Sequence, residues 1–256
     1  MKRVIISGIE GRMGKMLRSV IGTGPDFKDF EVVAGFDQID GSAEGVPVFS
    51  SPDACYETAP KADVVIDFSF YTFVPKVLRY CEITKTPAVI ATTALGENER
   101  ELMRKTTETI AVFNSANMSL GVNLVAKMSR LAAPALEEGF NIEIIETHHN
   151  QKKDAPSGTA ILLADAINSS LYERKDYIYG RHGREEKPSF SEIGIHAVRG
   201  GTIPGRHTVM FAGPDEVIEI THTAYSSKIF AIGALKAAAF ILDKPPPAEF
   251  AVHAER

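Results

Sequence analysis

Cysteine is scarce in this chain of 256 residues, which contains only Cys55 and Cys81. Two cysteines are too few for the disulfide framework of a small secreted protein, so we expect both thiols to stay reduced and buried. No run approaches the roughly 20 apolar residues that a membrane span needs. The apolar part of the N-terminal stretch MKRVIISG is also too short for a signal peptide. These absences favour a cytoplasmic protein that does not enter a membrane.

An excess of positive charge is also missing. The chain has 28 lysines and arginines against 33 aspartates and glutamates, which gives a formal net charge of -5. This balance argues against nucleic acid as a partner. Hydrophobic residues make up 44% of the chain, as is usual for a globular protein, and its length suits one large domain or two modest ones.

The first half of the sequence alternates short β-branched runs with segments of helical periodicity. This alternation predicts a Rossmann-like, doubly wound parallel sheet with helices on both faces, in the α/β class. We expect its strands at 3–8, 31–37, 46–49, 62–69, 87–93 and 110–116, and one of its helices at 97–108.

The second half has a different rhythm. After a long helix expected at about 119–138, strand-like segments follow one another with few helices between them, which predicts a second, α+β domain with a mixed open sheet. A hairpin turn is expected at 213–216. We therefore divide the chain into a first domain over 1–117, a second over 118–227 and a C-terminal helix, 228–256, that packs back on the first. Pro245 to Pro247 stop its apolar part, which covers 227–243.

A glycine-rich turn, GIEGRMG at 8–14, joins the first strand to a helix. Gly8, Gly11 and Gly14 depart from the strict G-x-G-x-x-G spacing, but they meet the same demand for a tight turn beside a pyrophosphate. The N–H groups at the helix start would hold the pyrophosphate. Asp37, at the end of the second strand, can accept hydrogen bonds from ribose hydroxyls. A plain strand-to-helix turn and a solvated acid are the alternatives.

The residues after Asp37 bear on the choice between NADH and NADPH. No arginine or lysine follows in the stretch DQIDGSAEG, so no neighbouring cation is available for a 2′-phosphate, and NADH is favoured. Arg12 can still reach such a phosphate, which leaves NADPH open.

The stretch ETHHNQKKDAPSGTA, at 146–160, places His148 and His149 beside two lysines and a helix start. A zinc site is disfavoured, because neighbouring side chains on a strand face opposite ways and no further ligand set accompanies them. Ser157 is the expected N-cap, and the N–H groups after it form an anion site. Imidazole, ammonium and a helix N-terminus indicate a pocket for an anionic substrate; solvated surface residues are the alternative.

This stretch resembles the pattern Glu-x-His-His-x-x-Lys-x-Asp-x-Pro-Ser-Gly-Thr-Ala of the 4-hydroxy-tetrahydrodipicolinate reductase family, which serves lysine and diaminopimelate biosynthesis. Every fixed position is present. The glycine turn is similar to that family's Gly-x-x-Gly-Arg-Met-Gly. Further resemblance is carried by DFS (67–69), ATTA (91–94), SANMSLGVN (115–123), RGGTIPGRH (199–207) and EVIEITHTA (216–224). The chain departs from the family at Ala91 and Ala94, where glycine is expected, at Lys228, often an arginine, and at Met118, usually a phenylalanine.

The resemblance implies NAD(P)H-dependent reduction of 4-hydroxy-tetrahydrodipicolinate to tetrahydrodipicolinate by a homotetramer. The first domain of the chain is expected to bind the dinucleotide. The second domain is expected to bind the substrate and to form the contacts between the subunits of the tetramer. Lys152 is the implied proton donor and His148 the acid/base. Substrate-binding residues are expected at His149, Ser157, Gly158 and Thr159. Cofactor-binding residues are expected at Gly8, Ile9, Glu10, Gly11, Arg12, Met13, Asp37, Phe68, Ala91, Thr92, Thr93, Ser115, Ala116, Asn117 and Met118.

The main alternative is another Rossmann-fold dehydrogenase that acts on a small dicarboxylate or semialdehyde. A semialdehyde dehydrogenase needs a nucleophilic cysteine near the nicotinamide, and neither Cys55 nor Cys81 is suitably placed in the sequence. A dinucleotide-sensing repressor would need a DNA-reading module, and no basic recognition helix is evident.

Overall fold

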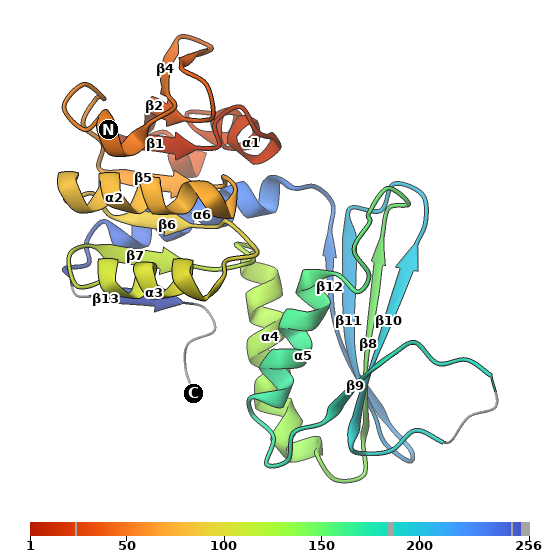
Figure 1. The fold of residues 1–256 in the computed structure, drawn as a ribbon. Helices are drawn as coiled ribbons and strands as arrows, with labels where there is room; N and C mark the ends of the chain where they lie inside the picture. The colour runs from red at the N-terminus through yellow and green to blue at the C-terminus, as the bar shows by residue number, and fades with distance from the viewer. Residues whose placement is uncertain (24, 184–186, 247, 252–256) are drawn as a thin grey trace. The chain divides into compact units, whose positions relative to one another are not determined.

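The computed structural model describes residues 1–23, 25–183, 187–246 and 248–251, which form two compact units (Figure 1). The first unit comprises Met1–Met118 together with the C-terminal segment from Ser227, and the second comprises Ser119–Ser226. Each unit has its own sheet. Within the described ranges, no helix is long and apolar enough to cross a membrane.

The first unit is built on an eight-stranded sheet of order β13-β7-β6-β5-β1-β2-β4-β3. All neighbouring strands run parallel except β3 and β4, which are antiparallel. The strands are β1 (Lys2–Ser7), β2 (Phe30–Phe36), β3 (Gly41–Ala43), β4 (Val46–Phe49), β5 (Val64–Asp67), β6 (Ala88–Ile90), β7 (Ala111–Asn114) and β13 (Ala248–Ala251). The helices are α1 (Arg12–Val20), α2 (Val74–Thr84), α3 (Glu97–Thr106) and α6 (Lys228–Ile241).

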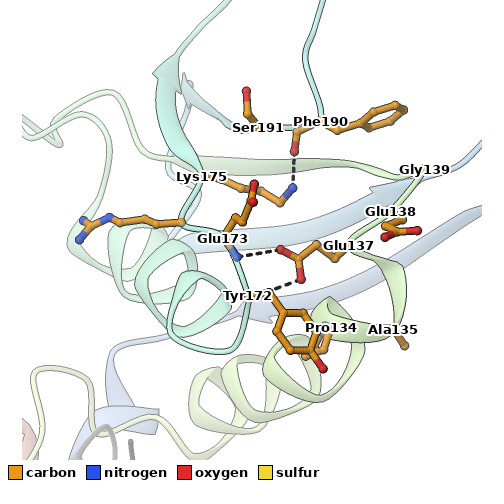
Figure 2. A pocket seen from close by; sticks show the side chains of 11 residues that line it. Pro134, Ala135, Glu137, Glu138, Gly139, Tyr172, Glu173, Lys175, Phe190 and Ser191 are labelled. Carbon is orange, nitrogen blue, oxygen red and sulfur yellow. Dashed lines mark hydrogen bonds between the residues drawn. The ribbon is translucent and has the colours of Figure 1, made fainter.

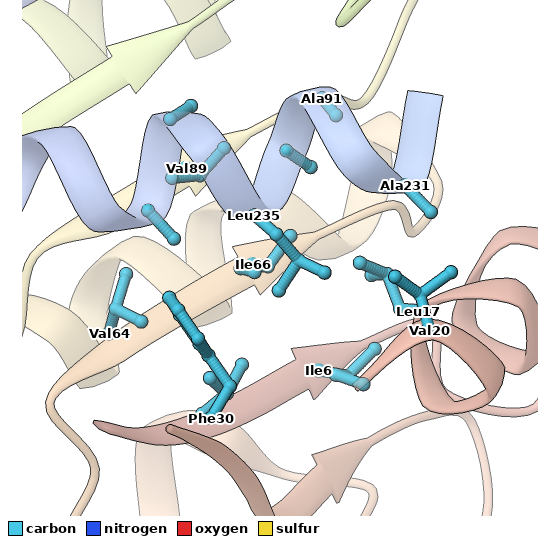
Figure 3. Packing of buried hydrophobic residues seen from close by; sticks show 14 of the residues in the cluster. Ile6, Leu17, Val20, Phe30, Val64, Ile66, Val89, Ala91, Ala231 and Leu235 are labelled. Atoms are coloured by element: carbon cyan, nitrogen blue, oxygen red, sulfur yellow. The ribbon is translucent and has the colours of Figure 1, made fainter. Parts of the chain in front are cut away.

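Both faces of this sheet are covered by helices, because alternate side chains of a strand point to opposite sides. Val4 and Ile6 pack into one core with residues of α1 and α6 such as Leu17 and Leu235 (Figure 3). Ile5, between them on β1, packs into a second core with α2 and α3. This two-sided burial confirms the doubly wound sheet predicted from the continuous apolar runs.

The C-terminal segment differs from its prediction. The helix expected within 228–256 ends at Ile241, and β13 then adds a parallel edge strand beside β7. Pro245 and Pro246 follow the helix and lack the N–H groups that would continue it. Residues 247 and 252–256 of the expected helix lie outside the described ranges.

The second unit has a five-stranded mixed sheet of order β12-β11-β8-β10-β9. The central strand β8 runs parallel to β10 and antiparallel to β11. The strands are β8 (Asn141–His148), β9 (Asp176–Tyr179), β10 (Glu192–Arg199), β11 (Gly205–Ala212) and β12 (Val217–Ala224). The turn predicted at 213–216 joins β11 to β12, with the Gly213 N–H donating to the Glu216 carbonyl at 2.9 Å.

Helices α4 (Leu120–Ala132) and α5 (Gly158–Asn168) pack on one face of this sheet. The helix expected at 119–138 ends earlier than predicted, at Ala132, and is followed by a 3₁₀ turn over Ala133–Leu136 that contains Pro134. Every second residue of β8 is buried, which places Ile142 and Ile144 in the core beneath the two helices. The same alternation buries Glu146 and His148.

Ala94 adopts a left-handed backbone conformation, with φ of 60°. This position, in the loop after β6, is one of the two at which the family pattern has glycine. A side chain in this conformation costs about 1–2 kcal/mol, which only glycine avoids.

We expect Ala94→Gly to raise the free energy of unfolding by about 0.5–1 kcal/mol, because relief of strain exceeds the extra chain entropy of glycine. Urea unfolding measures this change. Ala91→Gly is the matched control: Ala91 is buried and lacks a positive φ, so its replacement should lower stability. Equal losses at both positions would contradict the interpretation.

Candidate active site

The glycine turn lies directly against the strand-to-helix connection after β5. Gly8 has φ of 76°, and a Cβ there would lie 2.8 Å from the Phe68 carbonyl oxygen. A Cβ on Gly14 would lie 2.2 Å from the Gly8 carbonyl oxygen. Helix α1 starts at Arg12 with Gly11 as its N-cap. A side chain at Gly8 would therefore push the turn away from the connection after β5, and one at Gly14 would push helix α1 away from the turn. A phosphate-binding turn needs both of these close contacts.

A cavity of about 800 Å³ opens beside this turn. Six of the predicted cofactor residues line it: Gly8, Gly11, Arg12, Met13, Asp37 and Phe68. The lining also includes Ser69 of the DFS motif, and residues that the sequence analysis did not name, among them Phe70 and Lys76. A cavity of this size with a few polar groups suits a small-molecule cofactor.

Asp37 is held rigidly at the cavity. Its Oδ2 accepts the Glu10 N–H at 2.9 Å, and its Oδ1 accepts the Gln38 N–H at 2.8 Å. Each carboxylate oxygen retains a further lone pair for a ligand hydroxyl. The predicted residue Glu10 thus contacts Asp37 through its backbone, whereas Ile9 is fully buried and packs beneath Gly35.

The remaining predicted cofactor residues do not line this cavity. Ala91, Thr92 and Thr93 follow β6, and Ser115 to Met118 follow β7, so all lie at the carboxyl edge of the sheet, beyond the ends of its strands. Ser115 closes its own turn, because its Oγ donates to the Asn117 carbonyl at 2.8 Å. Ala116 is exposed, and Met118 is buried against α6. Parallel sheets bind ligands at this edge.

In the second unit, a fully buried carboxylate organises the histidine motif. Glu146 of β8 forms a bidentate pair with Arg199 of β10, with two Nη–Oε distances of 2.7 Å. Its Oε1 also accepts the Ser157 N–H at 3.0 Å, and its Oε2 lies 2.5 Å from His148 Nδ1. Burial alone would raise the pKa of Glu146, but hydrogen bonds from Arg199, His148 and Ser157 hold it below its usual value.

His148 is the last residue of β8 and is buried. Because ionised Glu146 can only accept, Nδ1 of His148 carries the proton and Nε2 keeps its lone pair. Burial lowers the pKa of His148, although Glu146 opposes this shift, so the ring is neutral near pH 7. Nε2 faces Gly205, where a Cβ would lie 3.1 Å away. Glycine there leaves space beside this nitrogen.

The helix start predicted at Ser157 is confirmed. Ser157 is the N-cap of α5, and its Oγ accepts the Ala160 N–H at 3.2 Å. That hydroxyl also lies 2.9 Å from Nε2 of His207 on β11. Ser157 is thus buried and engaged within the protein. Gly158 is exposed with open space around it, and Thr159 is half-buried beside it.

Lys152 and Lys153 differ in their surroundings. Lys152 keeps 21% of its side chain exposed, and its Nζ lies 2.8 Å from Asp154 Oδ1. Lys153 is exposed. His149 is half-buried, just past the end of β8, and its carbonyl accepts the Lys152 N–H at 3.2 Å.

Two residues that end the motif RGGTIPGRH, Arg199 and His207, belong to this site although the sequence analysis gave them no role in it. The His207 ring is edge-on to that of His148, with centroids 5.0 Å apart. Burial lowers the pKa of His207 to about 3, and the neighbouring His148 adds to this effect. Among the described residues, no group of three or more His, Cys, Asp and Glu is placed to hold a metal ion.

A second cavity, of about 730 Å³, lies elsewhere in the same unit (Figure 2). Glu137 accepts the backbone N–H groups of Tyr172 and Glu173 there, and Lys175 donates to the Phe190 carbonyl. None of the predicted site residues lines this cavity.

The two cysteines are unsuited to nucleophilic catalysis. Both are free and buried. Burial raises the pKa of Cys55 to about 11 and raises that of Cys81 well above its usual value. Protonated thiols are poor nucleophiles, which argues against a cysteine-dependent semialdehyde dehydrogenase.

Comparison with known families accounts for both units. Residues 2–118 match the family described as dihydrodipicolinate reductase, N-terminus, and residues 121–252 match dihydrodipicolinate reductase, C-terminus. The chain belongs to the dihydrodipicolinate reductase family. The resemblance noted in the sequence is therefore confirmed.

Individual members of the dihydrodipicolinate reductase family resemble the chain over nearly its whole length. The 4-hydroxy-tetrahydrodipicolinate reductase of Caldanaerobacter subterraneus subsp. tengcongensis is 48% identical, over 96% of this chain and 95% of its own. That of Clostridium tetani is 44% identical, over 96% and 93%. The solved structure described as the dipicolinate-bound dihydrodipicolinate reductase from Paenisporosarcina sp. TG-14 is 25% identical, with a TM-score of 0.81 over 98% of this chain and 97% of that one.

His207 should make the folded state sensitive to acid. Its folded pKa of about 3 lies below the usual 6.5, so the folded state binds fewer protons. The resulting stability is present above about pH 6.5 and is lost as the pH falls towards 3. Between pH 7 and 4.5, we expect wild type to lose about 2–3 kcal/mol more than His207→Gln in urea unfolding. Parallel losses in the two proteins would contradict the assignment.

Proposed function

We propose that this chain reduces 4-hydroxy-tetrahydrodipicolinate to tetrahydrodipicolinate with NADH as the favoured cofactor. The observation that carries the proposal is His148, held through Nδ1 by buried Glu146 and accompanied by Lys152 and the open N-terminus of α5. Two relatives that are named 4-hydroxy-tetrahydrodipicolinate reductase each match 96% of the chain. Dipicolinate, which a solved relative binds, is a dicarboxylate of the same class as this substrate.

The cavity beside the glycine turn fits the dinucleotide, which supplies a hydride when bound. Gly8 and Gly14 carry no side chain that would keep the backbone of the turn away from the pyrophosphate. The N–H groups at the start of α1 hold phosphate oxygens. Asp37 accepts hydrogen bonds from the ribose hydroxyls. Its carboxylate also repels a 2′-phosphate, which favours NADH over NADPH.

The motif after β8 binds and protonates the substrate. The N–H groups of Gly158 and Thr159 hold a substrate carboxylate, with His149 as a further donor. Lys152, which is paired with Asp154, gives the proton that the reduced substrate needs. His148, with its free Nε2, serves as the acid/base partner.

We also propose that the chain acts as a cytoplasmic homotetramer assembled through the second sheet. Helices α4 and α5 cover one face of this sheet. On the other face, Val198 and Val217 are 48% and 56% exposed. Apolar side chains exposed on a strand face favour pairing with another copy of the chain.

Lys152→Ala should lower kcat by about 10²–10⁴-fold, the usual loss of a placed proton donor, with NADH binding unchanged. Lys153→Ala is the matched control and should change kcat by less than about threefold. Steady-state kinetics of both variants, with circular dichroism as a folding check, make the comparison. Equal losses would mean that positive charge in general matters, and a larger loss at Lys153 would refute the register.

Asp37→Ala should weaken NADH binding by about tenfold, because hydrogen bonds to a charged group are lost, and should narrow any gap between NADH and NADPH. Calorimetric titration with both cofactors measures the effect. Asp29→Ala is the control: this acid precedes the amino end of β2 and pairs with Lys2 at 2.8 Å. Unchanged affinities in Asp37→Ala would refute the ribose assignment.

A further inference from the structure

Asp67, the last residue of β5, is a fully buried acid beside the cofactor cavity. Its Oδ1 accepts the Ser69 hydroxyl at 2.6 Å, and its Oδ2 lies 2.5 Å from Thr92 Oγ1. The ion pairs formed by described residues do not include Asp67. Among the described residues, the buried thiol of Cys81 on α2 is a titratable neighbour, and the charge of Asp67 would raise its pKa. An ionised carboxylate here would thus have no cation to offset its burial.

The Thr92 hydroxyl shows where a proton must lie. Its Oγ1 is 2.5 Å from Asp67 Oδ2 and 2.9 Å from the Ser69 carbonyl oxygen. Thr92 has a single hydroxyl hydrogen, and neither a carbonyl nor an ionised carboxylate can donate. With Asp67 ionised, one of these two contacts would bring together two oxygens without a hydrogen between them. With Oδ2 protonated, Asp67 donates to Thr92, and Thr92 donates to the Ser69 carbonyl.

This chain of hydrogen bonds reaches the lining of the cofactor cavity on the β5 side. Phe68 and Ser69 line the cavity, and the Gly8 turn rests on the Phe68 carbonyl. The Phe68 N–H also donates to the Ser7 carbonyl at 3.0 Å, and the Ala91 N–H donates to the Asp67 carbonyl at 2.9 Å. Asp67 therefore links the loop after β6 to the loop on which the glycine turn lies.

We propose that Asp67 acts as a neutral carboxylic acid, a positioning residue that holds the loops after β5 and β6 in the arrangement that receives the dinucleotide. Burial raises the pKa of Asp67, because its effect outweighs that of the hydrogen bonds that the carboxyl group accepts. This shift also favours the neutral acid. The proposal rests on the proposed function, in that the ligand of the cavity is a dinucleotide.

Asparagine is the test of the proton, because its Nδ2 can donate to Thr92 as the protonated acid does while its Oδ1 accepts from Ser69. Asp67→Asn should keep the NADH Kd within about twofold of wild type, whereas Asp67→Ala and Thr92→Val should raise it about tenfold or more. Asp63→Asn is the matched control, because Asp63 lies just before the start of β5 and its carboxylate pairs with Arg3 at 2.8 Å. It should leave the Kd unchanged.

Infrared spectroscopy provides a readout that a purely structural role would not change. The wild type minus Asp67→Asn difference spectrum should contain the carbonyl stretch of a protonated carboxylic acid, and the wild type minus Asp63→Asn spectrum should not. A carboxylate band in its place would overturn the proposal, as would Asp67→Asn weakening NADH binding as much as Asp67→Ala. If Asp67→Ala does not fold, Thr92→Val decides the effect on binding.

The two proposals fail in different ways. Wild-type protein that binds neither NADH nor NADPH would count against the proposed function, and the positioning role would fall with it, while the infrared band would still decide the protonation of Asp67. Normal NADH binding without the band would refute only the neutral acid.

Discussion

The buried carboxylate of Glu146 is the constraint on which the second unit's site depends. A charge without access to water is tolerated only when it is paired and hydrogen-bonded, and four donor groups meet this requirement. They come from the end of β8, the end of β10 and the start of α5. Arg199 also donates to the Asp154 carbonyl at 2.6 Å, which ties the loop carrying Lys152 to the same centre. Histidine, lysine and helix N-terminus are thereby fixed by one side chain.

Acidic residues perform three different tasks in this chain because their surroundings differ. Glu146 is buried beside a guanidinium, whose bidentate hydrogen bonds stabilise its ionised form. Asp37 is half-buried and accepts backbone N–H groups, which orients it without covering it. Asp67 is buried among hydroxyls with no cation paired to it among the described residues, an environment that favours the neutral acid. Residue type alone therefore does not specify the role of a carboxyl group.

Local signals in the sequence predicted the parts of the fold that short stretches determine. The apolar runs gave the central strands, and Ser157 marked the start of α5 because a cap acts within four residues. The edge strands β9 and β13 were missed, since DYIY and AEFA are too short to show a period. Arg199 and His207 were missed as site residues because they contact partners 53 and 50 positions away. Only the strand order β11-β8-β10 brings them there.

The register of β8 decides which glutamate becomes part of the site. Glu143 and Glu146 lie on the same strand but face opposite sides of the sheet, because they are three positions apart and the side-chain period is two. Glu143 pairs with Arg181 and His196 and keeps 14% of its side chain exposed, whereas Glu146 is fully buried. A slip of one residue would turn Glu146 and His148 away from the helices. Burial of Ile142 and Ile144 beneath α4 and α5 opposes that slip, so apolar packing four and six residues earlier in the strand holds His148 in place.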